Sequence, residues 1–245
     1  MILLFSIYIF FGILPSFIWL FYYLKKDLHP ESKKMVLKIF LWGTLSALPV
    51  YFTQVALKNL FASFALPLLF ANIIYWFLVI AFTEEIFKYL VVKFGALNSP
   101  SLDEPVDIMI YMIVSALGFA AIENIFYIIS SAINMSLDQT ITIAVFISIT
   151  RFIGATLLHT LCSASLGYFI ALSFFKTKDR LILFIFGLTL AVVLHGFYNF
   201  SIIRIKGPLI IELSIAFMVA FNALLSAFVF PKFKKLRKMK SICNL

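Results

Sequence analysis

Several ionisable side chains lie inside stretches of the sequence that are otherwise apolar. They are Glu84, Glu85, Lys88, Glu123, Arg151, His159 and His195. A charged residue at the centre of a membrane helix costs about 2.5 to 3.5 kcal/mol on insertion scales, so several together approach the stability of a whole domain. We therefore expect these side chains to face the interior of a helix bundle, where they are paired or in contact with water.

The spacing of two acids and a lysine defines one helix face. Glu84 and Lys88 are four residues apart with the acid first, so they share a face and can form an ion pair. Glu85 points about 100° away, and we expect it to find no partner on its own helix. A self-neutralising pair would explain Glu84 and Lys88 but would leave Glu85 unexplained.

Two histidines occur in separate apolar stretches. His195 and Asn199 are four residues apart on one helix face, and His159 follows Arg151 by two turns. One membrane histidine is typical of a helix-to-helix hydrogen bond, and Glu123 alone could be a buried strut. Two histidines in separate spans together with three carboxylates favour a catalytic or ligand-binding site over a purely structural role.

These residue types suit hydrolysis of a peptide bond inside a membrane, which needs an activated water and a stabilised oxyanion. Glu84 or Glu85 suits the general base. His159 and His195 suit binding of the water and of the developing oxyanion, to which the Asn199 amide donates a further hydrogen bond.

A divalent metal such as zinc is an alternative, because two histidines and one carboxylate with an open position form a catalytic zinc set. The candidate ligands are His159, His195 and Glu123. No HExxH motif fixes their geometry, so the sequence leaves the glutamic and the metal mechanism both open.

The composition predicts the elements that must position these residues. Of 245 residues, 63% are apolar and only 13% are charged, against about a quarter charged in soluble domains. Apolar runs of at least 18 residues are long enough to cross a bilayer as helices. We therefore predict an all-α, polytopic transmembrane bundle of seven or eight spans. The expected spans are residues 1–24, 36–57, 71–92, 107–131, 140–175, 181–203 and 209–230.

Two stretches leave the number of spans open. Pro67 interrupts the apolar residues 60–94, which favours an interfacial or re-entrant piece before it. Residues 140–175 fit an interfacial segment with a span from Arg151, one tilted helix or two short ones. Small residues from Gly118 onward would let another helix approach the Glu123 helix closely.

The net charge of +9 is concentrated in basic clusters beside the spans rather than on one nucleic-acid-binding face. The clusters follow the first span, residue 175 and the last span. Seven spans place all three in the cytoplasm, with the N-terminus outside and the C-terminus inside a cell membrane. We divide the chain into N-terminal transmembrane helices (1–60), a catalytic transmembrane core (61–203), and a last helix with a basic cytoplasmic tail (204–245).

An ordered set of motifs resembles the PrsW family of intramembrane proteases, relatives of the CAAX prenyl-endopeptidases and the abortive-infection glutamic proteases. The set is Glu84-Glu85-x-x-Lys88, Asp103-Glu104-Pro105-x-Asp107, Gly118-Phe119 with Glu123-Asn124, Arg151 with His159, and His195 with Asn199. It covers about half of the chain. The CAAX relatives carry arginine after EExxx where this chain has Lys88 after EExx, which argues against prenylated substrates.

The resemblance implies a membrane-embedded endopeptidase that cleaves a single-span membrane protein such as an anti-sigma factor. It implies that Glu84 and Glu85 are catalytic, with Glu84 activating water. His159, His195 and Asn199 would complete the site, with Glu123 as a further member.

Two other functions use similar residues. A proton-coupled transporter also buries carboxylates and histidines, but it predicts inverted repeats, and the two halves show no clear repeat. A non-catalytic scaffold or immunity protein with the same fold would tolerate loss of Glu84.

Overall fold

The computed structural model describes residues 2–27, 29–239 and 241, and these residues form helices and no strand. The elements are α1 (Ile2–Leu24), α2 (Lys33–Ala62), α3 (Leu68–Ile73), the π-helix η1 (Ile74–Phe82), α4 (Thr83–Gly95), α5 (Pro105–Ala132), α6 (Leu137–Ile153), α7 (Ala155–Phe175), the 3₁₀ turn η2 (Thr177–Asp179), α8 (Arg180–Ile202) and α9 (Ile210–Leu236). They make seven apolar helical stretches long enough to cross a membrane. The polytopic all-α fold is thereby confirmed, whereas the end of the expected tail (Lys240 and 242–245) lies outside the described residues.

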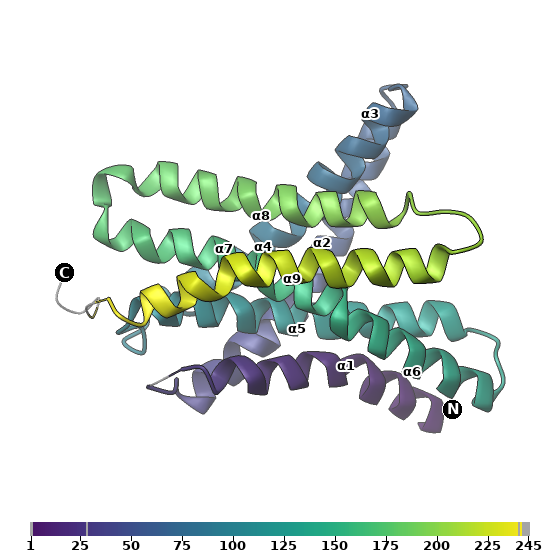
Figure 1. Cartoon of the computed structure of the whole chain (residues 1–245), viewed down its shortest axis with the longest axis horizontal. Coiled ribbons are helices and arrows are strands. Elements are labelled where there is room, and N and C mark those ends of the chain that lie inside the picture. Colours follow the sequence, from purple (N-terminus) through teal and green to yellow (C-terminus); the bar gives the residue numbers. More distant parts are fainter. Residues whose placement is uncertain (1, 28, 240, 242–245) are drawn as a thin grey trace.

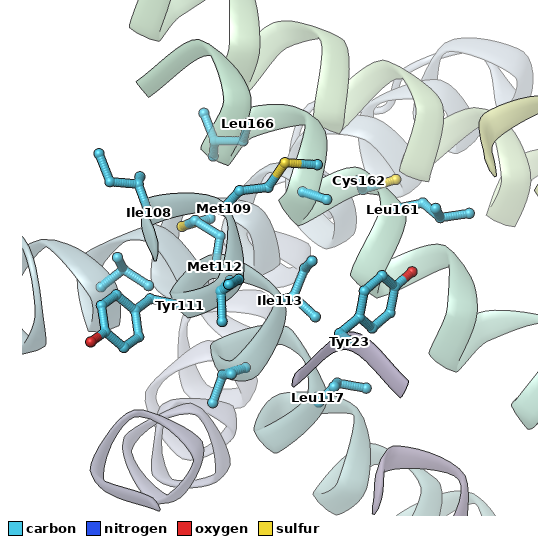
Figure 2. Close-up of a cluster of buried hydrophobic side chains, with 14 of the residues drawn as sticks. Tyr23, Ile108, Met109, Tyr111, Met112, Ile113, Leu117, Leu161, Cys162 and Leu166 are labelled. Atoms are coloured by element: carbon cyan, nitrogen blue, oxygen red, sulfur yellow. The ribbon is translucent and has the colours of Figure 1, made fainter. Parts of the chain in front are cut away.

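α5 is the central helix of the bundle (Figure 1). Its most apolar 18-residue window is 94% buried, against 22 to 39% for the other spans, whose large apolar side chains point outward. Figure 2 shows how Met109, Met112 and Ile113 of α5 pack beside Leu161 and Leu166 of α7. The apolar exterior suits lipid, and the core around α5 and α7 fixes the helices that carry the polar residues.

Close contact between α2 and α5 depends on two glycines. A Cβ atom on Gly118 would lie 2.1 Å from the Phe40 carbonyl oxygen, and one on Gly43 would lie 2.3 Å from the Ser115 carbonyl oxygen. The backbones therefore touch without intervening side chains. This confirms the close approach expected from the small residues near Gly118.

Both ambiguous stretches become single crossings interrupted by breaks in the α-helix. Residues 140–175 lie in α6 and α7, which meet at Gly154 (φ −99°, ψ −103°). Pro67 caps α3, which continues through η1 into α4. Of the interfacial or re-entrant piece expected before Pro67, the re-entrant alternative is wrong, because α2 extends to Ala62 and leaves only a turn before that proline.

The connections gather at two ends of the bundle (Figure 1). The start of α1 and the connections from α5 to α6 and from α8 to α9 lie at one end. The connections from α1 to α2 and from α7 to α8 lie at the other, together with the end of α9. All three basic clusters therefore lie at the same end.

Buried acids occupy this basic end as well. Glu31, in the connection from α1 to α2, accepts a hydrogen bond from the Tyr111 hydroxyl of α5. Burial raises the pKa of Glu31 above its usual value. Asp107 accepts hydrogen bonds from the backbone amides of Asp103 and Glu104 and so caps α5. Asp107 therefore stabilises the start of the central helix.

Candidate active site

The two glutamates and the lysine lie at the start of α4, directly after the π-helix η1. π-Helical turns are frequent at functional sites. Glu85 and Lys88 are fully buried and Glu84 is 5% exposed. Lys88 Nζ lies 2.7 Å from Glu85 Oε1 and 3.7 Å from Glu84 Oε2. The expectation that Glu85 has no partner on its own helix is therefore wrong, because residues three apart are also neighbours on a helix surface.

Both oxygens of Glu85 are occupied by donors from three helices. Oε1 accepts from Lys88 and from His195 Nδ1 of α8 at 3.0 Å. Oε2 accepts from the Ser163 hydroxyl of α7 at 2.9 Å. Glu85 thus links α4, α7 and α8 and orients the His195 ring, and each of its oxygens already accepts a hydrogen bond from a side chain.

Glu84 differs from Glu85 because one of its oxygens is buried without a hydrogen-bond partner among the described residues. Oε1 accepts from Gln54 Nε2 of α2 at 3.3 Å. Oε2 is the atom without a partner. Its near neighbours include His195 Nε2 at 3.7 Å and His159 Nδ1 at 3.9 Å. A buried carboxylate oxygen without a hydrogen bond is costly, so this position favours a bound proton, water or cation.

The two imidazole rings meet edge to face, with centroids 4.9 Å apart. A carboxylate accepts from the outer nitrogen of each ring: Glu85 from His195 Nδ1, and Glu123 from His159 Nε2 at 2.8 Å. These bonds fix the tautomers and leave His195 Nε2 and His159 Nδ1 as acceptors on the Glu84 side. Lys88 donates to His159 Nδ1 at 2.8 Å.

Glu123 lies on the outer side of His159 and is held by a cation. Arg151 Nη2 of α6 lies 2.6 Å from Glu123 Oε2. The Arg151 Nε group donates to the Asn124 side-chain oxygen, and its guanidinium covers the Tyr127 ring with its carbon 4.1 Å from the centroid. Glu123 therefore orients His159 and is itself fixed by Arg151.

A divalent metal fits the inner group of residues. Glu84, His159 and His195 each offer one ligand atom, and these atoms lie within 4.8 Å of one another. Two imidazoles and a carboxylate, each imidazole backed by a second carboxylate, match the donor set and the outer contacts of catalytic zinc sites. The set contains Glu84 where the sequence suggested Glu123. Lys88 already brings a positive charge to the same space and donates a hydrogen bond to His159 Nδ1, so a metal bound through that nitrogen would have to displace the Lys88 ammonium group.

Asn199 lies one turn beyond His195, in an adjoining cavity of about 370 Å³. This cavity also contacts Arg151, Tyr127 and Tyr198. The Asn199 amide makes no side-chain hydrogen bond to another residue in the part of the chain that the structure describes. The other five predicted site residues belong to one contact network, which reaches this cavity through Arg151 and Glu123.

Gln54 and Ser163 are part of this network but were not identified from the sequence. Gln54 lies in the N-terminal part of the chain and contacts Glu84, and Ser163 contacts Glu85. Ser163 is four residues after His159, so it lies on the same helix face. That spacing was the available signal, although serine in a membrane helix commonly bonds its own backbone instead.

Comparisons with known proteins identify the family of the chain. The family model described as PrsW family intramembrane metalloprotease matches residues 31–226. Protease PrsW of Geobacillus kaustophilus is 29% identical over 195 residues, covering 78% of each chain. Protease PrsW of Clostridioides difficile is 30% identical over 194 residues, covering 77% of this chain and 76% of that protein. Protease PrsW of Bacillus subtilis is 26% identical over 237 residues, covering 93% and 94%.

No solved structure matches the chain. The family match covers most of the chain, including every residue of the contact network around Glu84. The chain belongs to the PrsW family of intramembrane metalloproteases.

Proposed function

We propose that this chain is an intramembrane endopeptidase in which Glu84, His159 and His195 form the hydrolytic centre. One observation carries the assignment: the Oε2 atom of Glu84 is buried without a hydrogen bond from any described residue and faces the inner nitrogens of both histidines. A carboxylate oxygen without a donor is a better proton acceptor than one that already accepts a hydrogen bond. Glu84 has such an oxygen, whereas Glu85 accepts hydrogen bonds on both of its oxygens.

In the proposed reaction a water molecule beside Glu84 transfers a proton to Oε2 while its oxygen attacks the scissile carbonyl carbon. The carbonyl oxygen becomes negative and is stabilised by positive charge at Lys88 and by N–H donors, for which Asn199 is the candidate. Glu84 then gives the proton to the leaving nitrogen as the C–N bond breaks. One water is consumed, and a carboxyl and an amino terminus are formed.

The residues that would hold a metal are Glu84, His159 and His195, and the candidate is zinc. When bound there, the metal would supply a Lewis acid that polarises the carbonyl and acidifies water. Glu85 and Glu123 orient the two histidines in either mechanism, because each accepts the outer N–H of one ring. Support for the metal comes from the donor set, while Lys88 supports a reaction driven by Glu84 alone.

We further propose a single-span membrane protein, such as an anti-sigma factor, as the substrate. The cavity at Asn199 and Arg151 opens between α5, α6, α8 and α9, next to the predicted site. The gathering of basic clusters at one end supports a cytoplasmic C-terminus and an external N-terminus (Figure 1). A substrate helix would then approach from the bilayer.

The test is cleavage in vesicles that contain the purified chain and a panel of single-span membrane proteins. We expect a discrete cleavage, mapped by mass spectrometry of both products, that is lost in His159→Ala and in His195→Ala. Chelation followed by zinc addition distinguishes the mechanisms, since only the metal mechanism predicts reversible loss. Undiminished cleavage by both histidine variants would end the proposal.

A further inference from the structure

A second cavity, of about 390 Å³, lies between the ends of α1 and α9. The ends of α1 and α9 that line it lie at the end of the bundle where the basic clusters gather (Figure 1). Its lining consists of four cationic and four aromatic residues: Lys26, Lys234, Arg237 and Lys238, and Tyr22, Tyr23, Phe230 and Phe233. Among the described residues no carboxylate lines it, so these side chains give the cavity a positive field.

The positive charges around this cavity are not compensated within the part of the chain that the structure describes. None of the four cations forms an ion pair there, and the Lys26 ammonium group lies over the Tyr22 ring, 5.0 Å from its centroid. Arg237 Nε is buried and has no hydrogen-bond partner among the described residues. Leaving a charged N–H donor buried without an acceptor costs more than leaving a neutral one. The cavity therefore favours an anion that accepts hydrogen bonds from Arg237.

We propose that this cavity binds the phosphate group of an anionic phospholipid headgroup. Guanidinium and ammonium groups are the usual partners of phosphate in proteins. The cavity lies at the ends of two candidate spans, where lipid headgroups are expected, and its aromatic wall is apolar. Tyr22 and Phe230 are each 36% exposed on the outside of the bundle, where the acyl chains of a bound lipid would run.

The same cavity is linked to the helix that carries His159. Tyr23 lines the cavity, and its hydroxyl is hydrogen-bonded with the Thr160 hydroxyl at 3.0 Å. Thr160 is the neighbour of His159 on α7. A headgroup held between α1 and α9 would fix the two helices that cover this part of α7. The inference itself concerns binding only, and it does not depend on peptide hydrolysis.

The experiment measures binding of phosphatidylglycerol to the full-length chain in detergent by native mass spectrometry. The double variant Lys234→Gln/Arg237→Gln removes two cations from the cavity. The control Lys33→Gln/Lys34→Gln removes two exposed cations from the start of α2, at the same end of the bundle. A basic residue near an anionic lipid contributes about fivefold in affinity, so the cavity variant should bind about 30-fold more weakly, against less than about threefold for the control.

Two further ligands show whether the site recognises an anionic lipid headgroup or free phosphate. Phosphatidylcholine, which is zwitterionic, should bind the wild-type chain about 10-fold or more weakly than phosphatidylglycerol, since it lacks the net charge. Inorganic phosphate at millimolar concentration should not displace phosphatidylglycerol, because it gains nothing from the aromatic wall. Displacement by phosphate alone would overturn the lipid assignment and indicate a site for free phosphate.

Lys26→Gln removes a cation from the α1 side and tests the site if the α9 variant does not fold. It should weaken phosphatidylglycerol binding about fivefold. Equal loss of binding in the cavity and control variants, or no loss with Lys26→Gln, would overturn the proposal.

Discussion

Replacing Glu85 by glutamine should destabilise the protein, whereas the same change at the adjacent Glu84 should not. Glu85 and Lys88 are both fully buried with their charged atoms 2.7 Å apart. Removing one partner of a buried ion pair costs about 3 to 5 kcal/mol, because the other charge remains uncompensated. Lys88 keeps Glu84 at 3.7 Å, which places the expected loss near the lower limit, about 3 kcal/mol. For a chain of this length that corresponds to a fall in Tm of about 6 to 12 °C.

Thermal unfolding in detergent at a fixed heating rate measures this difference. Glu84→Gln is the matched control and should remain within about 1 kcal/mol of wild type, since its Oε2 makes no hydrogen bond and its Oε1 makes one long one. The double variant Glu85→Gln/Lys88→Met should recover most of the lost stability, because it removes the uncompensated charge. If Glu85→Gln unfolded with wild-type Tm, or the double variant were no better than the single one, the buried pair would not have the assigned role.

Three other predictions follow from the packing and the charges. Gly118→Ala should lower the free energy of unfolding by about 1 to 3 kcal/mol, because the new methyl group would clash with the Phe40 carbonyl oxygen. Thermal unfolding tests this by comparing the variant with Ser130→Ala, a control at an exposed position of the same helix. Glu123→Gln should lower cleavage about 10- to 100-fold without abolishing it, since the acceptor that orients the His159 ring loses its negative charge. The cleavage rate in vesicles tests this, and complete loss would instead make Glu123 essential to the reaction. Glu31→Gln should stabilise the protein at about pH 7.5 but not below about pH 4. Burial raises the pKa of Glu31, so folding of the wild type is disfavoured once the pH is high enough to ionise this acid. Glutamine stays neutral at every pH and therefore avoids this loss of stability. Equal stability of wild type and Glu31→Gln at both pH values would contradict this.

The convergence of the acids and histidines could be predicted from the sequence because burying charge in a membrane is costly. Charged and polar side chains in these spans had to face the interior of the bundle, and in a bundle of seven spans that interior is small enough to bring them into contact. They are Glu84, Glu85, Glu123, His159 and His195. The all-α class and a count of seven or eight spans followed from the length of the apolar runs, whereas residues 60–94 and 140–175 left the exact count open until the structure showed seven.

The partners within the network could not be predicted in the same way. Helical spacing allows Lys88 to pair with either glutamate, and the choice depends on how His195 and Ser163 fill the remaining positions around Glu85. Gln54 is neutral, so burying it leaves no strong signal in the sequence. Rotation of each helix about its own axis decides such contacts, and that rotation depends on packing with neighbouring helices.

The most direct test of the account is the cleavage rate of a single-span membrane protein in vesicles by wild type, by Glu84→Gln and by the exposed control Glu212→Gln. We expect Glu84→Gln to lose about a thousandfold or more of the activity while keeping the wild-type Tm, and Glu212→Gln to retain full activity. Cleavage by folded Glu84→Gln at the wild-type rate would contradict the assignment of the hydrolytic centre to the carboxylate between the two histidines.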